Sequence, residues 1–400
     1  MTSDLPLFAA RLREFISICE SEPECFAPGA EPALREHNDA EFNGFALVLF
    51  ARQFEHNSPY RKFCESRLVL PDTVSHWTQI PALPVAAFKE FEVSCLPRAE
   101  RTRVFYSSGT TGQQPSRHFH HAESLALYET SLLAWFRAHL LRQPASEISN
   151  FDWLILTPPT AQALNSSLVH MLESIRRQLA APAAAVVGRV AGDSQWTLDF
   201  ERALTALHAA VESERPLIIP GTAFSFVHLL DFLAEKNLRF SLPPGSRVME
   251  TGGYKNRSRT LPKTDLHALI TQRLGIPPSH IVCEYGMSEL SSQAYDRVAG
   301  DEWRGTNSGS VPVPPPPVTR HFRFPPWARA RIVSLETGRE VADGQTGLVR
   351  VVDLANVFSV LALQTEDLAI RRGEAFELVG RAELAEPRGC SLLAAEIAAP

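Results

Sequence analysis

A loop of glycines and small hydroxyl residues is the first part of the chain that could do chemistry. It reads SSGTTGQQPSR over 107–117 and follows a predicted strand over 103–106. Glycines allow tight turns that expose backbone amides, and the hydroxyls add further donors, so such a loop suits phosphate oxygens. It lacks the Gly-Lys-Ser/Thr of a Walker A loop. The candidate phosphate-binding residues are Ser107, Ser108, Gly109, Thr110, Thr111 and Gly112.

Three further short motifs lie along the chain, and one of them carries residue types suited to a nucleotide. The sequence EYGMSE over 284–289 follows a predicted strand and combines an aromatic ring, which suits a purine, with a carboxylate, which suits Mg²⁺. The sequence ETGGYKNRSR over 250–259 also follows a predicted strand. The third, QTEDL over 364–368, contains Asp367 and precedes Gly380-Arg381. Alone, each motif could equally be a surface turn or a packed strand end.

Composition excludes several classes of protein. The chain has 400 residues with 45 acidic and 39 basic side chains, a net charge of −6, whereas proteins that bind nucleic acid usually carry a basic surplus. No apolar stretch approaches the ~18 residues of a membrane span, and the first residues lack a secretory pattern. The six cysteines form no CxxC pair. We therefore expect a cytoplasmic protein with reduced thiols, no membrane span and no nucleic-acid partner.

The pattern of apolar runs predicts an α/β fold with a mainly parallel sheet flanked by helices. Predicted strands alternate with helices, and the strand ends near 107, 220 and 251 turn through glycine, proline or small polar residues. Ligands of open α/β sheets bind beyond the carboxyl ends of strands, so we expect these turns to share one site. The predicted strands cover 103–106, 153–156, 217–219, 247–250 and 281–284, and the helices 123–140, 164–179, 222–235 and 262–274.

The same reading divides the chain into four segments. Residues 1–100 are expected to form a mostly helical N-terminal region, and 101–302 the α/β core that carries the phosphate-loop candidate. A proline-rich stretch over 311–327, expected to hold no regular structure, leads into a small β subdomain over 303–379 with strands at 330–334, 347–352 and 357–363. The last segment, 380–400, is a short tail carrying Cys390.

Taken together, the motifs resemble those of the adenylate-forming superfamily, which includes acyl-CoA synthetases, luciferases and peptide-synthetase adenylation domains. The 108–112 sequence resembles its phosphate loop, and Tyr-Gly-Met-Ser-Glu resembles its Tyr-Gly-x-Thr-Glu element. The resemblance implies the superfamily's large domain, with ATP and Mg²⁺ as cofactors. It implies that Tyr285 lines the adenine, Glu289 binds Mg²⁺ and Asp367 holds the ribose. The other residues implied to bind ATP are Thr251, Gly252, Gly253, Gly286, Ser288 and Arg381.

Finer resemblance identifies one branch, the LuxE-type acyl-protein synthetases of bacterial bioluminescence operons. It includes the 250–259 motif, SSLVHM over 166–171, PVAAFKE over 84–90, SRH over 116–118 and the extension LSSQ after Glu289. The family activates a fatty acid as acyl-AMP and transfers the acyl group to a cysteine near its own C-terminus, then to an acyl-reductase partner. Cys390, in RGCSL over 388–392, stands in the matching place, and a thiolate is a suitable nucleophile for a mixed anhydride.

The distribution of lysine agrees with that branch. Typical superfamily members have a C-terminal lid of roughly a hundred residues with a lysine that contacts the α-phosphate. Here the last lysine is Lys263 and only residues 382–400 follow Arg381, so we expect the lid to be reduced to a short tail. Arg117, Lys255 and Arg257 are candidates to neutralise the α-phosphate in its place, and each could equally be a surface cation.

The sequence indicates less clearly which residues would bind the acyl group. His170, on a predicted helix, is a candidate donor to the acyl carboxylate, or a structural histidine bonded to a carbonyl. Phe224, Phe226, Leu229 and Leu230 could line an acyl tunnel, although their helical spacing is more typical of core. The type and chain length of the acid stay open, as do the acceptor and the oligomeric state.

Two alternative functions remain at the level of sequence. The chain could be an acyl-CoA or acyl-carrier-protein ligase that uses an external thiol, in which case Cys390 would be dispensable. It could also be a degenerate nucleotide-binding scaffold that holds a partner, although the motifs around Glu289, Asp367 and the phosphate loop are all intact.

Overall fold

The structure, a computed structural model, describes residues 4–22, 31–107, 114–141, 150–179, 184–192, 195–254, 258–298 and 320–382. Three of the helices begin after a residue that is typical of helix N-termini: Ser166, Asp199 and Thr222 each accept a backbone N–H of the first turn. The helices are α1 (Asp4–Ser21), α2 (Pro32–His56), α3 (Ser58–Glu65), α4 (Ala87–Glu90), α5 (Ala122–Phe136), α6 (Ser167–Gln178), α7 (Phe200–Ser213), α8 (Ala223–Glu235) and α9 (Lys263–Leu274).

Among the described residues, twelve strands form one mixed sheet, in the order β13-β14-β15-β16-β12-β11-β10-β9-β8-β4-β5, with β1 paired to β15. Strands β5, β4, β8, β9 and β10 are parallel, and from β10 to β13 each neighbour is antiparallel. These strands are β1 (Leu83–Pro84), β4 (Asp152–Ile155), β5 (Ala185–Val186), β8 (Leu217–Thr222), β9 (Arg247–Thr251), β10 (Ile281–Tyr285), β11 (Ala294–Val298), β12 (Arg320–Arg323), β13 (Ala328–Val333), β14 (Thr346–Asp353), β15 (Ala362–Arg372) and β16 (Ala375–Arg381).

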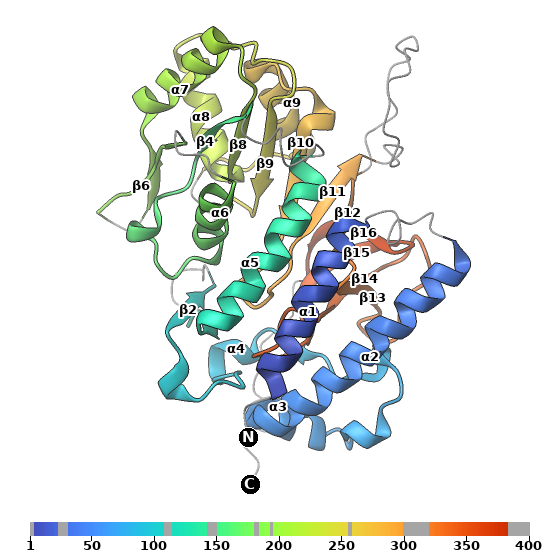
Figure 1. The fold of residues 1–400 in the computed structure, drawn as a ribbon. Coiled ribbons are helices and arrows are strands. Elements are labelled where there is room, and N and C mark those ends of the chain that lie inside the picture. Colours follow the sequence, from blue (N-terminus) through green and yellow to red (C-terminus); the bar gives the residue numbers. More distant parts are fainter. Residues whose placement is uncertain are drawn as a thin grey trace.

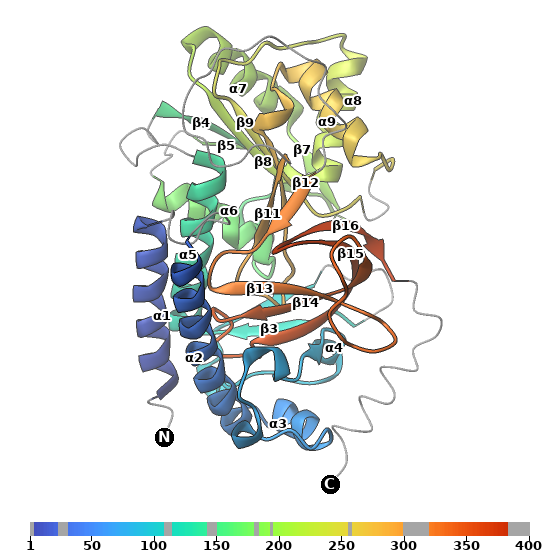
Figure 2. The same ribbon diagram turned by 90° about the vertical axis from the view of Figure 1, so that its right-hand side faces the viewer.

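Both faces of the parallel half are covered by helices, which is why its strands are largely apolar. Alternate residues of each strand point to opposite faces: Ile219 and Val248 pack with α7, α8 and α9, while Ile218 and Met249 pack with α5 and α6. Figures 1 and 2 show this half as one lobe, with α1 and α2 lying against the antiparallel half. Two small hairpins lie outside the large sheet: β2 (Arg103–Tyr106) with β3 (Arg117–His120), and β6 (Gly188–Val190) with β7 (Trp196–Leu198).

The structure corrects several expectations. The segment from Pro220 to Thr222 is the end of strand β8, not a turn, because it continues the parallel register with β9. Residues 357–361 are buried turns before β15, not strand. Regular structure does occur within 311–327, because Arg320–Arg323 forms β12. The proposed phosphate loop lies within the β2–β3 hairpin, outside the large sheet. One sheet contains strands from the second and third predicted segments, and the division into domains stays a prediction.

Candidate functional site

The proposed phosphate loop connects strands β2 and β3, which are tightly hydrogen-bonded to each other where the loop begins and ends. Tyr106 of β2 pairs with Arg117 of β3. Beyond this pair the backbone N–H of Ser107 donates to the carbonyl of Ser116 (3.2 Å), and the N–H of Ser116 donates to the hydroxyl of Ser107 (2.9 Å). The chain therefore leaves and returns at a fixed point, although the segment 108–113 itself lies outside the described residues.

Three residues from separate motifs meet at one carboxylate. Tyr285, at the end of β10, donates its hydroxyl to Oδ2 of Asp367 on β15 (2.8 Å). Arg381, paired with Asp367 across β15 and β16, donates Nε to Oδ1 (3.0 Å). Burial and the neighbouring carboxylate raise the pKa of Tyr285, so it remains a neutral donor. The tyrosine ring packs edge-on against Phe322, Phe324 and Phe376.

The ends of β9 and β10 are joined by side chains. Thr251 donates its hydroxyl to Oε2 of Glu284, and burial raises the pKa of Glu284 to about 7. A side chain at Gly286 would crowd this carboxylate, because a Cβ there would lie 2.3 Å from Oε1 of Glu284. Gly252 has φ +70° with open space around it, so backbone conformation rather than crowding requires glycine there. At Gly253 a Cβ would meet nothing within 4 Å.

The candidate metal ligand, Glu289, lies on the buried segment between β10 and β11. The hydroxyl of Ser288 donates to Oε2 of Glu289 (3.0 Å), and Nδ1 of His118 lies 2.8 Å from the Ser288 carbonyl. The described residues hold no group of three or more metal-ligating side chains. Mg²⁺ in nucleotide sites usually takes one or two carboxylates and completes its shell with water and phosphate, so a single carboxylate here fits that metal.

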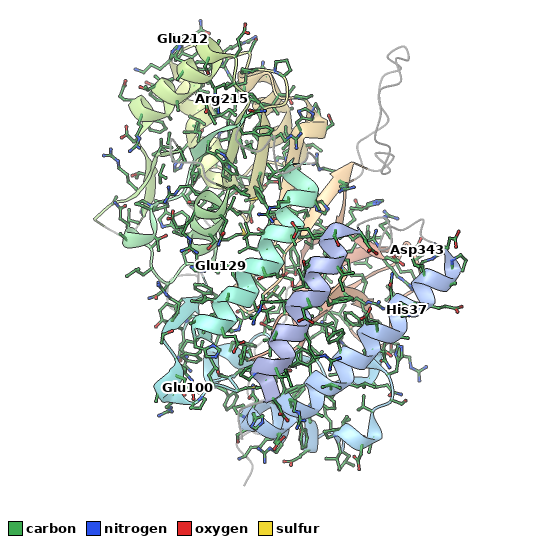
Figure 3. All side chains as sticks on the ribbon, in the orientation of Figure 1. His37, Glu100, Glu129, Glu212, Arg215 and Asp343 are labelled. Carbon is green, nitrogen blue, oxygen red and sulfur yellow. The ribbon has the colours of Figure 1, made fainter. Side chains whose placement is uncertain are left out.

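Arg117 is the first residue of β3 in the hairpin, and His170 lies on α6 beside strand β2. Nε2 of His170, on α6, is 3.1 Å from Oε1 of Glu129, and the His170 ring packs near Phe105 of β2. Figure 3 labels Glu129 on α5. Arg117 donates Nη2 to the carbonyl of Lys89 (3.3 Å), while its buried Nε has no hydrogen-bond partner among the described residues. The structure thus brings both residues to the hairpin that carries the loop.

Sequence reasoning missed a buried ionic cluster behind Thr251. Oε1 of Glu250 lies 3.2 Å from Nε2 of His267 and 3.4 Å from Nζ of Lys263, and that Nζ lies 2.6 Å from Sγ of Cys283. Burial alone would raise the pKa of Glu250. The nearby Lys263 and His267 outweigh burial and lower this pKa to about 2. The sequence signal for this cluster is the i, i+4 spacing of Lys263 and His267, which places the two side chains on one face of α9.

Other predicted site residues lie outside the described residues, namely Ser108, Gly109, Thr110, Thr111, Gly112, Lys255, Arg257 and Cys390. Of the six cysteines, Cys19, Cys64, Cys95 and Cys283 are described, and all four are buried and in no disulfide among the described residues. Within the described part of the chain, no helix is both long and apolar enough to cross a membrane.

The apolar residues considered for an acyl tunnel are core. Phe226, Leu229 and Leu230 are buried between α8 and the sheet, and Phe224 is buried beside them. A small cavity lies elsewhere, at the carboxyl ends of β4 and β5 beside α6. Its lining includes Ile155, Thr157, Val169, Leu172 and Val186.

Comparison with solved structures identifies the fold. The chain is similar to 2-hydroxyisobutyryl-CoA ligase in complex with 2-HIB-AMP and CoA in the thioesterification state, with a TM-score of 0.62, 14% identity and coverage of 88% of this chain and 69% of that one. The open conformation of the same ligase gives 0.61 at 13% identity, covering 90% and 78%. The fold is therefore that of the adenylate-forming enzymes, as the motifs predicted.

The family follows from the sequence comparisons. The model of the family described as "Acyl-protein synthetase, LuxE" matches residues 29–398, so the chain belongs to this family of ligases. It is 24% identical over 371 residues to the long-chain-fatty-acid–luciferin-component ligase of Vibrio harveyi, covering 86% of this chain and 85% of that protein. The ligase of the same name from Aliivibrio fischeri is 22% identical over 370 residues, covering 87% and 86%.

Proposed function

We propose that the chain uses ATP to activate a carboxylic acid, most favourably a long-chain fatty acid, and transfers the acyl group to its own Cys390. In the first step a carboxylate oxygen attacks the α-phosphorus of ATP. The bond from that phosphorus to the oxygen bridging to the β-phosphate breaks, and pyrophosphate leaves with the electron pair. The product is an acyl-AMP mixed anhydride.

In the second step the Cys390 thiolate attacks the acyl carbonyl carbon. The bond between that carbon and the phosphate oxygen breaks, AMP leaves, and the thiol proton passes to solvent. The resulting thioester retains enough free energy to acylate a further acceptor, which we take to be a partner acyl reductase or a carrier protein.

The observation that carries the proposal is the Tyr285–Asp367–Arg381 contact. Two donors fix the orientation of the Asp367 carboxylate before any ligand binds, and a carboxylate held this way is preorganised to accept the two hydroxyls of a ribose. Tyr285 would then present its ring to the adenine. In this arrangement Arg381 acts by holding Asp367 rather than by touching the nucleotide.

The phosphates would lie against the loop that leaves Ser107. With Thr251 and the two glycines after it, the loop supplies backbone and hydroxyl donors to the nucleotide. Glu289 would hold Mg²⁺, which when bound neutralises the charge of the phosphates. Arg117 and Lys255 would offset the remaining charge at the α-phosphate; the buried, unbonded Nε of Arg117 supports this role.

The acid would bind on the α6 side of the hairpin, beside His170. Because Nε2 of His170 faces Glu129, donation to the carboxylate would use Nδ1. The names of the Vibrio harveyi and Aliivibrio fischeri relatives support a long-chain fatty acid as the substrate. Family membership, in turn, supports a protein thiol rather than coenzyme A as the acceptor.

Intact-protein mass spectrometry tests the proposal. The full chain is incubated with ATP, Mg²⁺ and a panel of fatty and aromatic acids, with Cys390→Ser and, as a matched control, Cys25→Ser. We expect one acyl adduct on the wild type and on Cys25→Ser, removed by hydroxylamine, and none on Cys390→Ser.

The other outcomes separate the alternatives. If no adduct forms while wild type and Cys390→Ser release pyrophosphate equally with the same acid, the acceptor is an external thiol and the Cys390 assignment is wrong. If no acid supports pyrophosphate release or exchange, the chain does not activate acids, and a nucleotide-binding scaffold becomes the better description.

A further inference from the structure

The segment that carries Glu289 is buried but has no regular secondary structure. From Ser288 to Gln293 each residue is buried, between the end of β10 and the start of β11. Buried backbone groups outside helices and sheets need hydrogen-bond partners from turns, side chains or water. The position of Glu289 therefore depends on the side chains that reach this segment from elsewhere in the fold.

One side of the segment is anchored to the turn after β14. Asp353 accepts the backbone N–H groups of Ser291 (2.9 Å) and Ser292 (2.8 Å), and the hydroxyl of Ser292 (2.7 Å). Asn356 donates Nδ2 to the carbonyl of Glu289 itself (2.9 Å). Both anchoring side chains are fully buried. This side is tied to the antiparallel half of the large sheet.

The other side is held by the hairpin. Nδ1 of His118 lies 2.8 Å from the carbonyl of Ser288, the residue before Glu289. A carbonyl can only accept, so Nδ1 carries the proton. The ring is buried between Phe88 and His120. Burial lowers the pKa of His118 to about 4, so the ring is neutral at ordinary pH.

His118 also lies close in sequence to the closed base of the loop. It follows Ser116 by two positions on β3, and Ser116 is bonded to Ser107 at the point where the loop leaves and returns. A displacement at the base of the loop would therefore be transmitted along β3 to the His118 ring, and through its hydrogen bond to the Ser288 carbonyl.

We propose that His118 is a positioning residue, whose hydrogen bond to the Ser288 carbonyl couples the base of the Ser107–Ser116 loop to the orientation of the Glu289 carboxylate. The inference rests on the proposed function, which assigns phosphates to the loop and Mg²⁺ to Glu289. It adds that the position of the loop and the orientation of Glu289 are coupled through the His118 side chain, which would contact neither the phosphates nor the metal.

The test measures binding of Mn²⁺ to the full chain with α,β-methylene-ATP, by electron paramagnetic resonance and calorimetry, so that no turnover is needed. His118→Leu removes the donor, whereas His118→Asn keeps an N–H close to the position of Nδ1. His120→Leu is the matched control, because His120 is buried on the same strand without a bond to the segment. Urea unfolding of each variant reports whether it is folded.

We expect His118→Leu to weaken Mn²⁺ binding roughly 10-fold, as loss of groups that orient a metal ligand commonly does. His118→Asn should recover most of the affinity, and His120→Leu should retain it. The decisive comparison is the Glu289→Ala background, where His118→Leu should have less than about a twofold further effect, since residues that act through one another are non-additive.

An equal loss from His118→Leu in both backgrounds would mean a general structural role and overturn the inference. Unchanged affinity in a folded His118→Leu would overturn it too, while leaving the proposed function intact if Glu289→Ala is impaired. If Glu289→Ala binds Mn²⁺ as the wild type does, the metal assignment in the proposed function fails and the inference fails with it.

Discussion

Tyr285 and Asp367, separated by 82 positions in the sequence, are joined by a 2.8 Å hydrogen bond between the phenol hydroxyl and Oδ2. The bond joins β10 of the parallel half of the sheet to β15 of the antiparallel half. It also links two motifs that sequence reasoning had connected only by their order along the chain. The predictions below follow from this contact and from its neighbours.

Replacing Tyr285 with Phe should lower the free energy of unfolding by about 1.5–3 kcal/mol, because a buried carboxylate loses a donor. ATP should also bind more weakly, since Asp367 would keep only Arg381 to orient it. Urea unfolding and calorimetric titration with ATP measure the two effects. Tyr106→Phe is the control for stability, because Tyr106 is 40% exposed and should change by less than about 0.5 kcal/mol. A Tyr285→Phe variant as stable as this control would contradict the prediction.

Gly286→Ala should destabilise the folded chain by about 1–3 kcal/mol. The new Cβ would lie 2.3 Å from Oε1 of Glu284, and that carboxylate cannot move away without losing its bond from Thr251. Gly253→Ala is a matched substitution just after the neighbouring strand β9, where a Cβ meets nothing within 4 Å, and it should be tolerated in unfolding experiments. Equal stability of the two variants would show that the Glu284 carboxylate is free to shift.

The titration of Glu284 should make stability fall as pH rises. Its folded-state pKa is raised from 4.5 to about 7, so the folded chain holds this proton more strongly than the unfolded chain does. The contribution of this proton to the free energy of unfolding is fully present below about pH 4.5 and is lost as pH rises through 7. The free energy of unfolding then changes by up to roughly 3 kcal/mol. Asp353, with a pKa raised to about 6, acts in the same direction.

The Glu284→Gln substitution removes the titration of Glu284 and leaves that of Asp353 in place. The urea midpoint of this variant, followed from pH 5 to 8, should rise relative to the wild type as pH increases, because the amide mimics the protonated acid. A constant difference between the two proteins across this range is the result that would refute the raised pKa.

The parallel half of the fold was predictable because burial on both faces leaves continuous apolar runs. The strands ending near 156, 251 and 285 were predicted within one or two residues for this reason. Strand β3 was missed because Arg-His-Phe-His is polar, although His118 and His120 are buried. Conversely, residues 357–361 are apolar and buried but form turns, and periodicity cannot separate a buried turn from a buried strand.

The candidate site was predictable only where its residues fall within motifs. Tyr285, Glu289 and Asp367 each follow a recognisable pattern. Asp353 and Asn356, which hold the segment of Glu289, lie more than sixty positions away from their partners, and their neighbouring residues carry no pattern that indicates the contact. Contacts of this kind arise from how β14 packs against the segment after β10, and the roles proposed for the site residues await the experiments above.

The burial of four cysteines has a practical consequence for following the reaction. Cys19, Cys64, Cys95 and Cys283 are shielded from solvent, and burial raises the pKa of Cys64 to about 12 and that of Cys95 and Cys283 as well. A brief pulse of maleimide on the folded chain should leave these four unlabelled, so any incorporated dye reports Cys25 or Cys390. In a Cys25→Ser background, loss of fluorescence labelling after incubation with ATP and acid would then count occupied thioester in real time.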